Sequence, residues 1–335
     1  MKDQAKDIIK FGLAAALALA IFPGVQALGS GARSAAQSAQ EQQSKQPPPQ
    51  SGQAQQNQPA QQGQSSSGQP GPSLRNPQAA PASQPAISPA ESEAYKAIMQ
   101  ELDPAKQLSL IKNFEKQFPN STLLSDVYFF AANAEEQEND APNALIYGQK
   151  SLKLQPDNLR SLILVAGLLP LPQTLQGTTD QKVQQLSVSE DDANRALQLL
   201  AHLPPPSTET ADQFKVGKQL IVAQVHAALG MAHLQKALIG PSTAASSELT
   251  MAEQEFKSAV ACPQPNPQDY YRLGEVYTRE NRLDDAIGAF TQSAQLGQGK
   301  LIEKFANDMV QKLKAFQAKQ GAAPTTGSAA APAKQ

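Results

Sequence analysis

The stretch PQDYYRLGEVYTRENRLDDAIGAFTQSAQLGQG, residues 267–299, decides the fold of this chain. Its first half carries apolar, aromatic or small residues at steps of three and four, which fall on one face of a helix: Tyr270, Leu273, Gly274 and Tyr277. A second stripe of this kind follows a turn at Asn281: Leu283, Ala286, Ile287 and Phe290. Gly274 has no side chain at the place where the second helix must come close. One such pair cannot bury both apolar faces alone, so the stretch predicts a helix pair within a stack of similar pairs.

The spacing Tyr270-x2-Leu273-Gly274-x2-Tyr277, followed by Ala286-x3-Phe290, resembles the tetratricopeptide repeat (TPR), a helix–turn–helix unit of about 34 residues. The same relative spacing returns after Asp126: Tyr128, Ala131, Ala132, Ala144 and Pro156. The resemblance implies an all-α fold, a TPR-like helix–turn–helix solenoid with a C-terminal capping helix. We expect about five helix pairs in residues 89–318, since single repeats are not stable alone.

Residues 300–318 carry one apolar stripe, as a capping helix requires. The stripe consists of Leu301, Phe305, Met309, Leu313 and Phe316. We expect Leu273 and Phe290 to be buried within the last pair and to be covered by the cap through Leu301 and Phe305.

The N-terminal residues 1–28 have the layout of a secretory signal peptide. Three lysines precede the apolar run FGLAAALALAIF, and Val25-Gln26-Ala27 then offers a cleavage site. The run is shorter than the ~20 residues that span a bilayer. The alternative is an uncleaved signal anchor formed by residues 8–28, which would be the chain's only membrane contact. Both alternatives export the chain, either into the periplasm or medium or onto the outer side of the inner membrane.

Residues 29–88 are rich in Gln, Pro and Ser and contain few charges. Such a composition cannot bury enough apolar area to offset chain entropy, so we expect a disordered linker. Residues 319–335 have a similar bias and predict a disordered tail.

Composition and motifs argue against several function classes. The net charge of −2 gives no attraction to nucleic acid. The sequence has no G-x-S-x-G, H-E-x-x-H, phosphate-binding loop or C-x-x-C motif. The one cysteine, Cys262, ends an apolar helical run and is interpreted as a small buried hydrophobe. We therefore expect a non-catalytic protein without a cofactor or a metal.

Two histidines occupy aromatic positions of the repeat pattern in His226-x2-Leu229-Gly230-x2-His233. Seven residues of helix separate them by roughly 10 Å, which is too far for two ligands of one ion. With no third ligand evident in the sequence, we interpret both as packing residues. Long insertions are expected within the third and fourth pairs, as loops 170–190 and 240–250, and an enzyme site in these loops is the least favoured alternative.

In TPR proteins the first helices of successive pairs line a concave groove, and the resemblance places partner-binding residues beside the packing stripe. The candidates are Asp126, Phe129, Asn133, Glu136, Arg160, Ile163, Gln268, Tyr271, Glu275 and Thr278. Acidic, amide and aromatic side chains of this kind suit an extended peptide or a helix. The other interpretation is that these are ordinary solvated residues.

The sequence therefore predicts a protein-interaction scaffold or assembly factor of the cell envelope that binds another protein. The alternative is a structural or glycan-associated envelope protein.

Overall fold

The computed structural model describes residues 87–205 and 210–321. These residues form eleven α-helices and no strand, as the sequence predicts. The helices are α3 (Pro89–Gln100), α4 (Pro104–Gln117), α5 (Leu124–Gln137), α6 (Ala141–Leu154), α7 (Leu159–Leu168), α8 (Thr179–Ala201), α9 (Ala211–Ile239), α10 (Ala245–Val260), α11 (Pro267–Arg279), α12 (Leu283–Leu296) and α13 (Leu301–Gly321). The predicted signal segment, nearly all of the predicted linker and residues 322–335 lie outside the described ranges.

The first two helices begin where local sequence signals predict. Ser88 accepts a hydrogen bond from the backbone N–H of Glu91, and the Glu91 carboxylate accepts one from the Ser88 N–H, which completes a capping box. Asp103 caps α4 by accepting a hydrogen bond from the backbone N–H of Lys106, with Pro104 at the first helical position. Short-range chemistry therefore places these helix starts without help from the rest of the chain.

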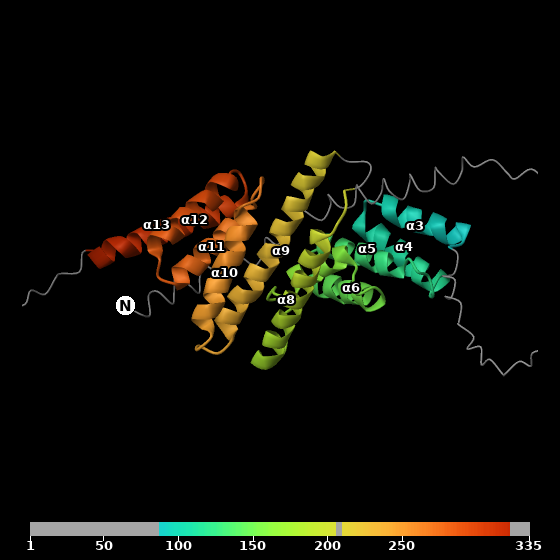
Figure 1. Cartoon of the computed structure of the whole chain (residues 1–335), viewed down its shortest axis with the longest axis horizontal. Helices are drawn as coiled ribbons and strands as arrows, with labels where there is room; N and C mark the ends of the chain where they lie inside the picture. The colour runs from blue at the N-terminus through green and yellow to red at the C-terminus, as the bar shows by residue number, and fades with distance from the viewer. Residues whose placement is uncertain (1–86, 206–209, 322–335) are drawn as a thin grey trace, which may run out of the picture.

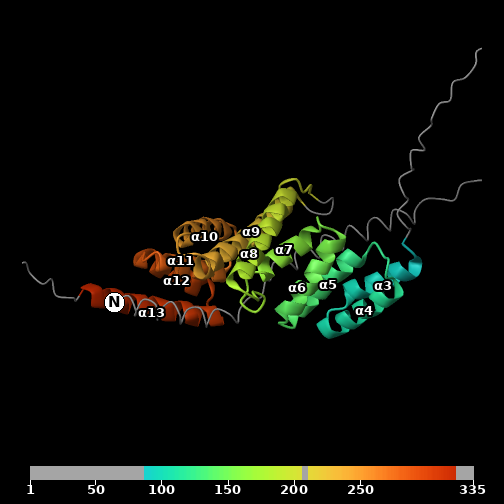
Figure 2. The same ribbon diagram turned by 90° about the horizontal axis from the view of Figure 1, so that it is seen from below.

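The helices pack as five consecutive pairs and a cap. The two members of each pair contact one another, and each second helix contacts the first helix of the next pair. Figures 1 and 2 show the helices in chain order along the long axis, from α3 at one end to α13 at the other. Within the described residues this is the architecture of a TPR-like solenoid.

Close glycine contacts fix the register of the pairs. A Cβ added at Gly274 would lie 2.9 Å from the Phe290 ring, and one at Gly230 would lie 2.9 Å from the Phe256 ring. Both phenylalanines are fully buried, and Leu273 is also buried. The same glycine–phenylalanine contact thus closes the pairs α9–α10 and α11–α12, which confirms the predicted core.

The predicted insertions are much shorter than expected, and the loop boundaries 170–190 and 240–250 are wrong. Helix α8 begins at Thr179, because Thr178 forms a capping box with Gln181. Its extra turns bury Leu186 and Ser189. In the fourth pair only residues 240–244 lie between α9 and α10.

The cap buries Met309 and Leu313 of the predicted stripe but leaves its first residue, Leu301, outside the core. Ile302, Ala306, Met309 and Leu313 are buried in the same apolar cluster as Phe290, and Phe305 is partly buried there. Leu301 remains 49% exposed, so its predicted role in covering the last pair is wrong. The reason is that the buried stripe starts at Ile302 and Leu301 falls beside it.

The apolar core is divided among four clusters. Large clusters fill α3–α7 and α9–α13, and a third joins α7, α8 and α9. The fourth is small and contains Leu175, Leu186 and Ala232, with Ile239 packed against it. Within residues 87–205 and 210–321, no helix is both long enough and apolar enough to cross a membrane.

Candidate functional site

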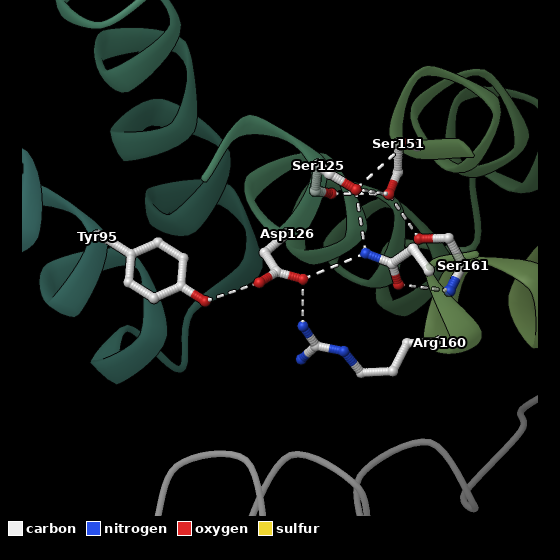
Figure 3. Close-up of polar contacts among 7 residues, drawn as sticks. Tyr95, Ser125, Asp126, Ser151, Arg160 and Ser161 are labelled. Carbon is white, nitrogen blue, oxygen red and sulfur yellow. Dashed lines mark hydrogen bonds and ion pairs between the residues drawn. The ribbon is translucent and has the colours of Figure 1, made fainter. Parts of the chain in front are cut away.

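Two predicted binding residues, Asp126 of α5 and Arg160 of α7, come together in the structure. Arg160 Nη2 donates to Asp126 Oδ1 at 2.5 Å. The same oxygen accepts from Asn158 Nδ2 at 3.2 Å, and Tyr95 of α3 donates its hydroxyl to Asp126 Oδ2 at 3.5 Å. Figure 3 shows Tyr95 and Arg160 approaching Asp126 from different helices. One carboxylate therefore connects the first helices of three successive pairs.

Aromatic rings support the arginine in this arrangement. The Arg160 guanidinium carbon lies 4.5 Å from the centroid of the Phe129 ring and 5.4 Å from that of Phe130. Such contacts are cation–π interactions. Phe129 is only 4% exposed, so the prediction that it binds a partner directly is wrong. The Phe129 ring is covered by the apolar core around it and by Arg160. It holds the Arg160 side chain in position.

A buried hydroxyl network fixes the backbone beneath the arginine. Ser151 Oγ donates to the Ser125 carbonyl oxygen at 2.7 Å, and Ser161 Oγ donates to Ser151 Oγ at 2.7 Å. Asn158 Nδ2 also donates to Ser125 Oγ at 3.1 Å, and its Oδ1 caps α7. Sequence reasoning missed these residues, because serines on three helices give no periodic signal. They hold α5, α6 and α7 at fixed distances.

Other groups of this region have shifted pKa values. Burial, and then the charge of Asp126, raises the pKa of Tyr95 to about 12 against the opposing effect of Arg160. Burial alone raises the pKa of Glu136, two turns beyond Phe129 on α5, to about 7. Asn133 and Glu136 are half-buried, whereas Ile163 is buried and belongs to the core. We call Asp126, Asn133, Glu136 and Arg160 the first-helix surface.

The corresponding residues of the last pair lie in a different environment. Tyr271 is only 2% exposed and packs edge-on against Phe290, with ring centroids 5.0 Å apart. Its pKa is raised chiefly by burial, then by the charge of Glu275, with a further contribution from Asp308 of α13. The prediction that Tyr271 faces a groove outside the core is therefore wrong. The cap places α13 beside α11, where a further repeat would otherwise begin.

The other three candidates of α11 offer little to a partner. Glu275 is 5% exposed and forms an ion pair with Arg272 at 2.8 Å. Thr278 donates its hydroxyl to the Gly274 carbonyl oxygen at 2.7 Å. Gln268 is half-buried at the start of the helix. The C-terminal pair thus uses most of its predicted binding residues for its own packing.

The two histidines of α9 lie beside carboxylates from other helices. His226 Nδ1 lies 2.6 Å from Glu255 Oε2. His233 Nδ1 lies 2.8 Å from Glu248 Oε2 and 3.3 Å from Glu190 Oε1. Both side chains are mostly buried, as packing residues are, and each also pairs with carboxylates that the sequence analysis did not identify. The partners lie on α8 and α10, which the periodicity of α9 alone does not reveal.

Comparison with known proteins gives distant structural matches. No protein-family model matches the sequence, and no curated protein matches it. A crystal structure of a thermophilic TPR protein from Thermus thermophilus is similar, with 16% identity and a TM-score of 0.44 over 67% of this chain and 99% of that one. A MamA double mutant gives 14% identity and a TM-score of 0.42 over 63% of this chain and 96% of that one. It is the helix pairs and glycine–phenylalanine contacts of this chain that make it a TPR-like solenoid.

Proposed function

We propose that this protein is a non-catalytic scaffold that binds another protein, as an extended peptide or a helix, on the first-helix surface of α5 and α7. The observation that carries the proposal is the position of Arg160 between the Asp126 carboxylate and the Phe129 ring. Its side chain keeps 16% of its area exposed. The Arg160 guanidinium is therefore held in one position before a partner binds.

The fixed position of Arg160 lowers the cost of binding. Immobilising a long side chain on association costs about 0.5–1.5 kcal/mol, and here the ion pair and the rings have already restrained it. A guanidinium has five N–H donors, and Arg160 donates one of them to Asp126 Oδ1. The remaining donors suit a carboxylate or a backbone carbonyl of a partner. Arginine is also among the residue types enriched at binding hot spots.

Neighbouring groups extend the polar surface along α5. Asn133 offers an amide, and Glu136 has its pKa raised by burial to about 7. Near that pH a carboxyl can accept a hydrogen bond or donate one. These groups match the alternating donors and acceptors of a peptide backbone better than they match a purely apolar ligand.

We also propose that the protein acts in the cell envelope, as the layout of residues 1–28 indicates. An alkaline phosphatase fusion is expected to be active, and N-terminal sequencing of the exported protein is expected to begin at Leu28. An intact Met1 in the membrane fraction would favour the anchor, and an inactive fusion would contradict export.

The binding proposal is tested by crosslinking and pull-down from envelope fractions with the full-length protein, followed by mass spectrometry. Arg160→Gln is expected to reduce recovery of the partner about tenfold or more, since it removes the guanidinium. Arg195→Gln is the matched control. Arg195 lies on the second helix α8, and its ion pair with Asp157 is exposed. Equal recovery with both variants would contradict the proposed surface. Recovery of peptidoglycan alone would favour the structural or glycan-associated alternative.

A further inference from the structure

Two carboxylates and one imidazole from three helices meet beside the smallest of the core clusters. Glu190 of α8, His233 of α9 and Glu248 of α10 place one ligand atom each within 4.8 Å of one another. Their side chains are 18%, 14% and 17% exposed, respectively. The cluster therefore lies mostly out of solvent and joins the third helix pair to the fourth.

The hydrogen bonds of the cluster leave one oxygen without a donor. His233 Nδ1 can carry one hydrogen, and the nearer acceptor is Glu248 Oε2 at 2.8 Å. Glu190 Oε1, at 3.3 Å from the same nitrogen, is buried and has no hydrogen-bond partner among the described residues. Leaving a buried charged acceptor unsatisfied is unfavourable, and such an atom calls for a partner.

We propose that Glu190, His233 and Glu248 bind one zinc ion. Zinc takes imidazole nitrogen at about 2.0–2.1 Å and carboxylate oxygen at about 2.0–2.2 Å, which separates tetrahedral ligand atoms by roughly 3.3 Å. The distance from His233 Nδ1 to Glu190 Oε1, 3.3 Å, matches this value, and the 2.8 Å to Glu248 Oε2 is shorter, so an ion would move these two atoms slightly apart. An ion between the three atoms interacts with all of them at once, including the oxygen that lacks a donor. Three protein ligands leave a fourth position for water.

Lys236 supports Glu190 from outside the cluster. Its Nζ lies 2.6 Å from Glu190 Oε2, whereas the other oxygen, Oε1, is the one near His233. An outer hydrogen bond of this kind orients a ligating carboxylate. Two carboxylates and one lysine carry a net charge of −1 beside the imidazole, which favours a cation over an anion.

The position of the cluster indicates a structural role for the ion. Glu190 follows Leu186 by one helical turn, and His233 follows Ala232, and both apolar residues belong to the smallest core cluster. Three coordinated side chains would link α8, α9 and α10 beside the smallest of the four core clusters. The ion is therefore expected to stabilise the junction between the third and fourth pairs.

The test uses the full-length protein, freed of metal with EDTA and then titrated with ZnCl2 by calorimetry. We expect one zinc ion per chain. At a zinc concentration a hundredfold above Kd, the melting temperature is expected to rise by about 5–10 °C. MgCl2 is expected to have no such effect, because imidazole suits transition metals better than magnesium. The whole sequence has three histidines and one cysteine, so few other ligands compete.

Two isosteric variants separate the site from general surface binding. Glu190→Gln is expected to weaken zinc binding at least about tenfold and to remove the rise in melting temperature. Its metal-free melting temperature is expected to be lower, because Lys236 loses its carboxylate partner, so the change in melting temperature on adding zinc is the measurement that counts. His226→Gln is the matched control, because His226 has one carboxylate partner, Glu255, on the same helix pair. A wild type that does not respond to zinc, or an equal loss of binding in both variants, would overturn the proposal.

Discussion

The N-terminal and C-terminal ends of the solenoid use the same sequence positions differently. Phe129 on α5 and Tyr271 on α11 follow the first position of the repeat pattern by one residue, and both are buried. Phe129 lies beneath Arg160 of the next first helix, so a charged group remains at the surface. Tyr271 packs on Phe290 of its own pair, next to the cap. The function of a repeat position therefore depends on which helix follows it, a further first helix or α13.

The largest effect is expected when the core contact of the C-terminal pair is removed. Phe290→Ala is expected to lower the free energy of unfolding by about 3–5 kcal/mol, because it removes a fully buried ring and leaves a cavity next to Gly274. Urea denaturation of the full-length protein measures the change. Phe256→Ala, which has the same contact with Gly230, serves as the matched variant. A loss of less than about 0.5 kcal/mol in both variants, as expected for exposed residues, would contradict the register of both pairs.

Tyr271→Ala tests the difference between the two ends directly. Because Tyr271 is 2% exposed and packs on Phe290, we expect a loss of about 3 kcal/mol in stability. If Tyr271 instead faced a groove, as its position beside the packing stripe predicts, the change would leave stability almost unchanged and weaken partner binding. Thermal melting of Tyr271→Ala distinguishes these two expectations, and Phe129→Ala is measured beside it.

Phe129→Ala is expected to be similarly destabilising and, in addition, to impair partner capture, since it removes the support of Arg160. If Tyr271→Ala melts at the same temperature as the wild type, the burial of Tyr271 is contradicted and Tyr271 belongs to the surface. Loss of partner capture in Tyr271→Ala alone would move the binding surface to the C-terminal end.

Local signals explain why the fold could be predicted. The stripes of α11 and α12, the glycine at their crossing and the caps at Ser88 and Asp103 all act within one helix pair. The site could be predicted only in part. The repeat spacing predicts Asp126 and Arg160 on successive first helices, but it does not predict that they form a pair. Their ion pair depends on side chains of a neighbouring pair, which periodicity does not specify.

The histidine cluster shows the same limit more clearly. His233 occupies a position of the repeat pattern that is normally aromatic, so the sequence predicts a packing contact there. Glu190 and Glu248 come from α8 and α10, and the long α8 was itself predicted to be mostly loop. A side-chain cluster built from three helices therefore became visible only when the helices were placed in space.

The same chemical change is expected to have opposite signs at the two ends. Burial raises the pKa of Asp269, at the start of α11, from its ordinary value of 3.8 to about 7, against the opposing charge of Arg272. The folded state thus holds the proton more tightly than the unfolded state. This contribution to stability is present below pH 3.8 and is lost as pH rises through 7.

Asp269→Asn is therefore expected to be about 2 kcal/mol more stable than the wild type at pH 8 and nearly equal to it at pH 4. Asp126→Asn, in contrast, weakens the acceptor of Arg160 and is expected to cost about 1 kcal/mol at pH 8, after allowance for solvent screening. Urea denaturation at both pH values measures the differences. A stability difference between Asp269→Asn and wild type that does not change with pH would contradict the burial of Asp269.

The smallest effect is expected at the first residue of the cap. Leu301 is 49% exposed, so Leu301→Ala is expected to change the free energy of unfolding by less than about 0.5 kcal/mol. Met309→Ala is the matched control on the same helix and is expected to cost about 2–5 kcal/mol, because Met309 is 4% exposed and lies in the core. If Leu301→Ala were the more damaging of the two, α13 would pack one residue out of its present register. That shift would also rotate Asp308 relative to Tyr271, and the contrast between the two ends would lose its structural cause.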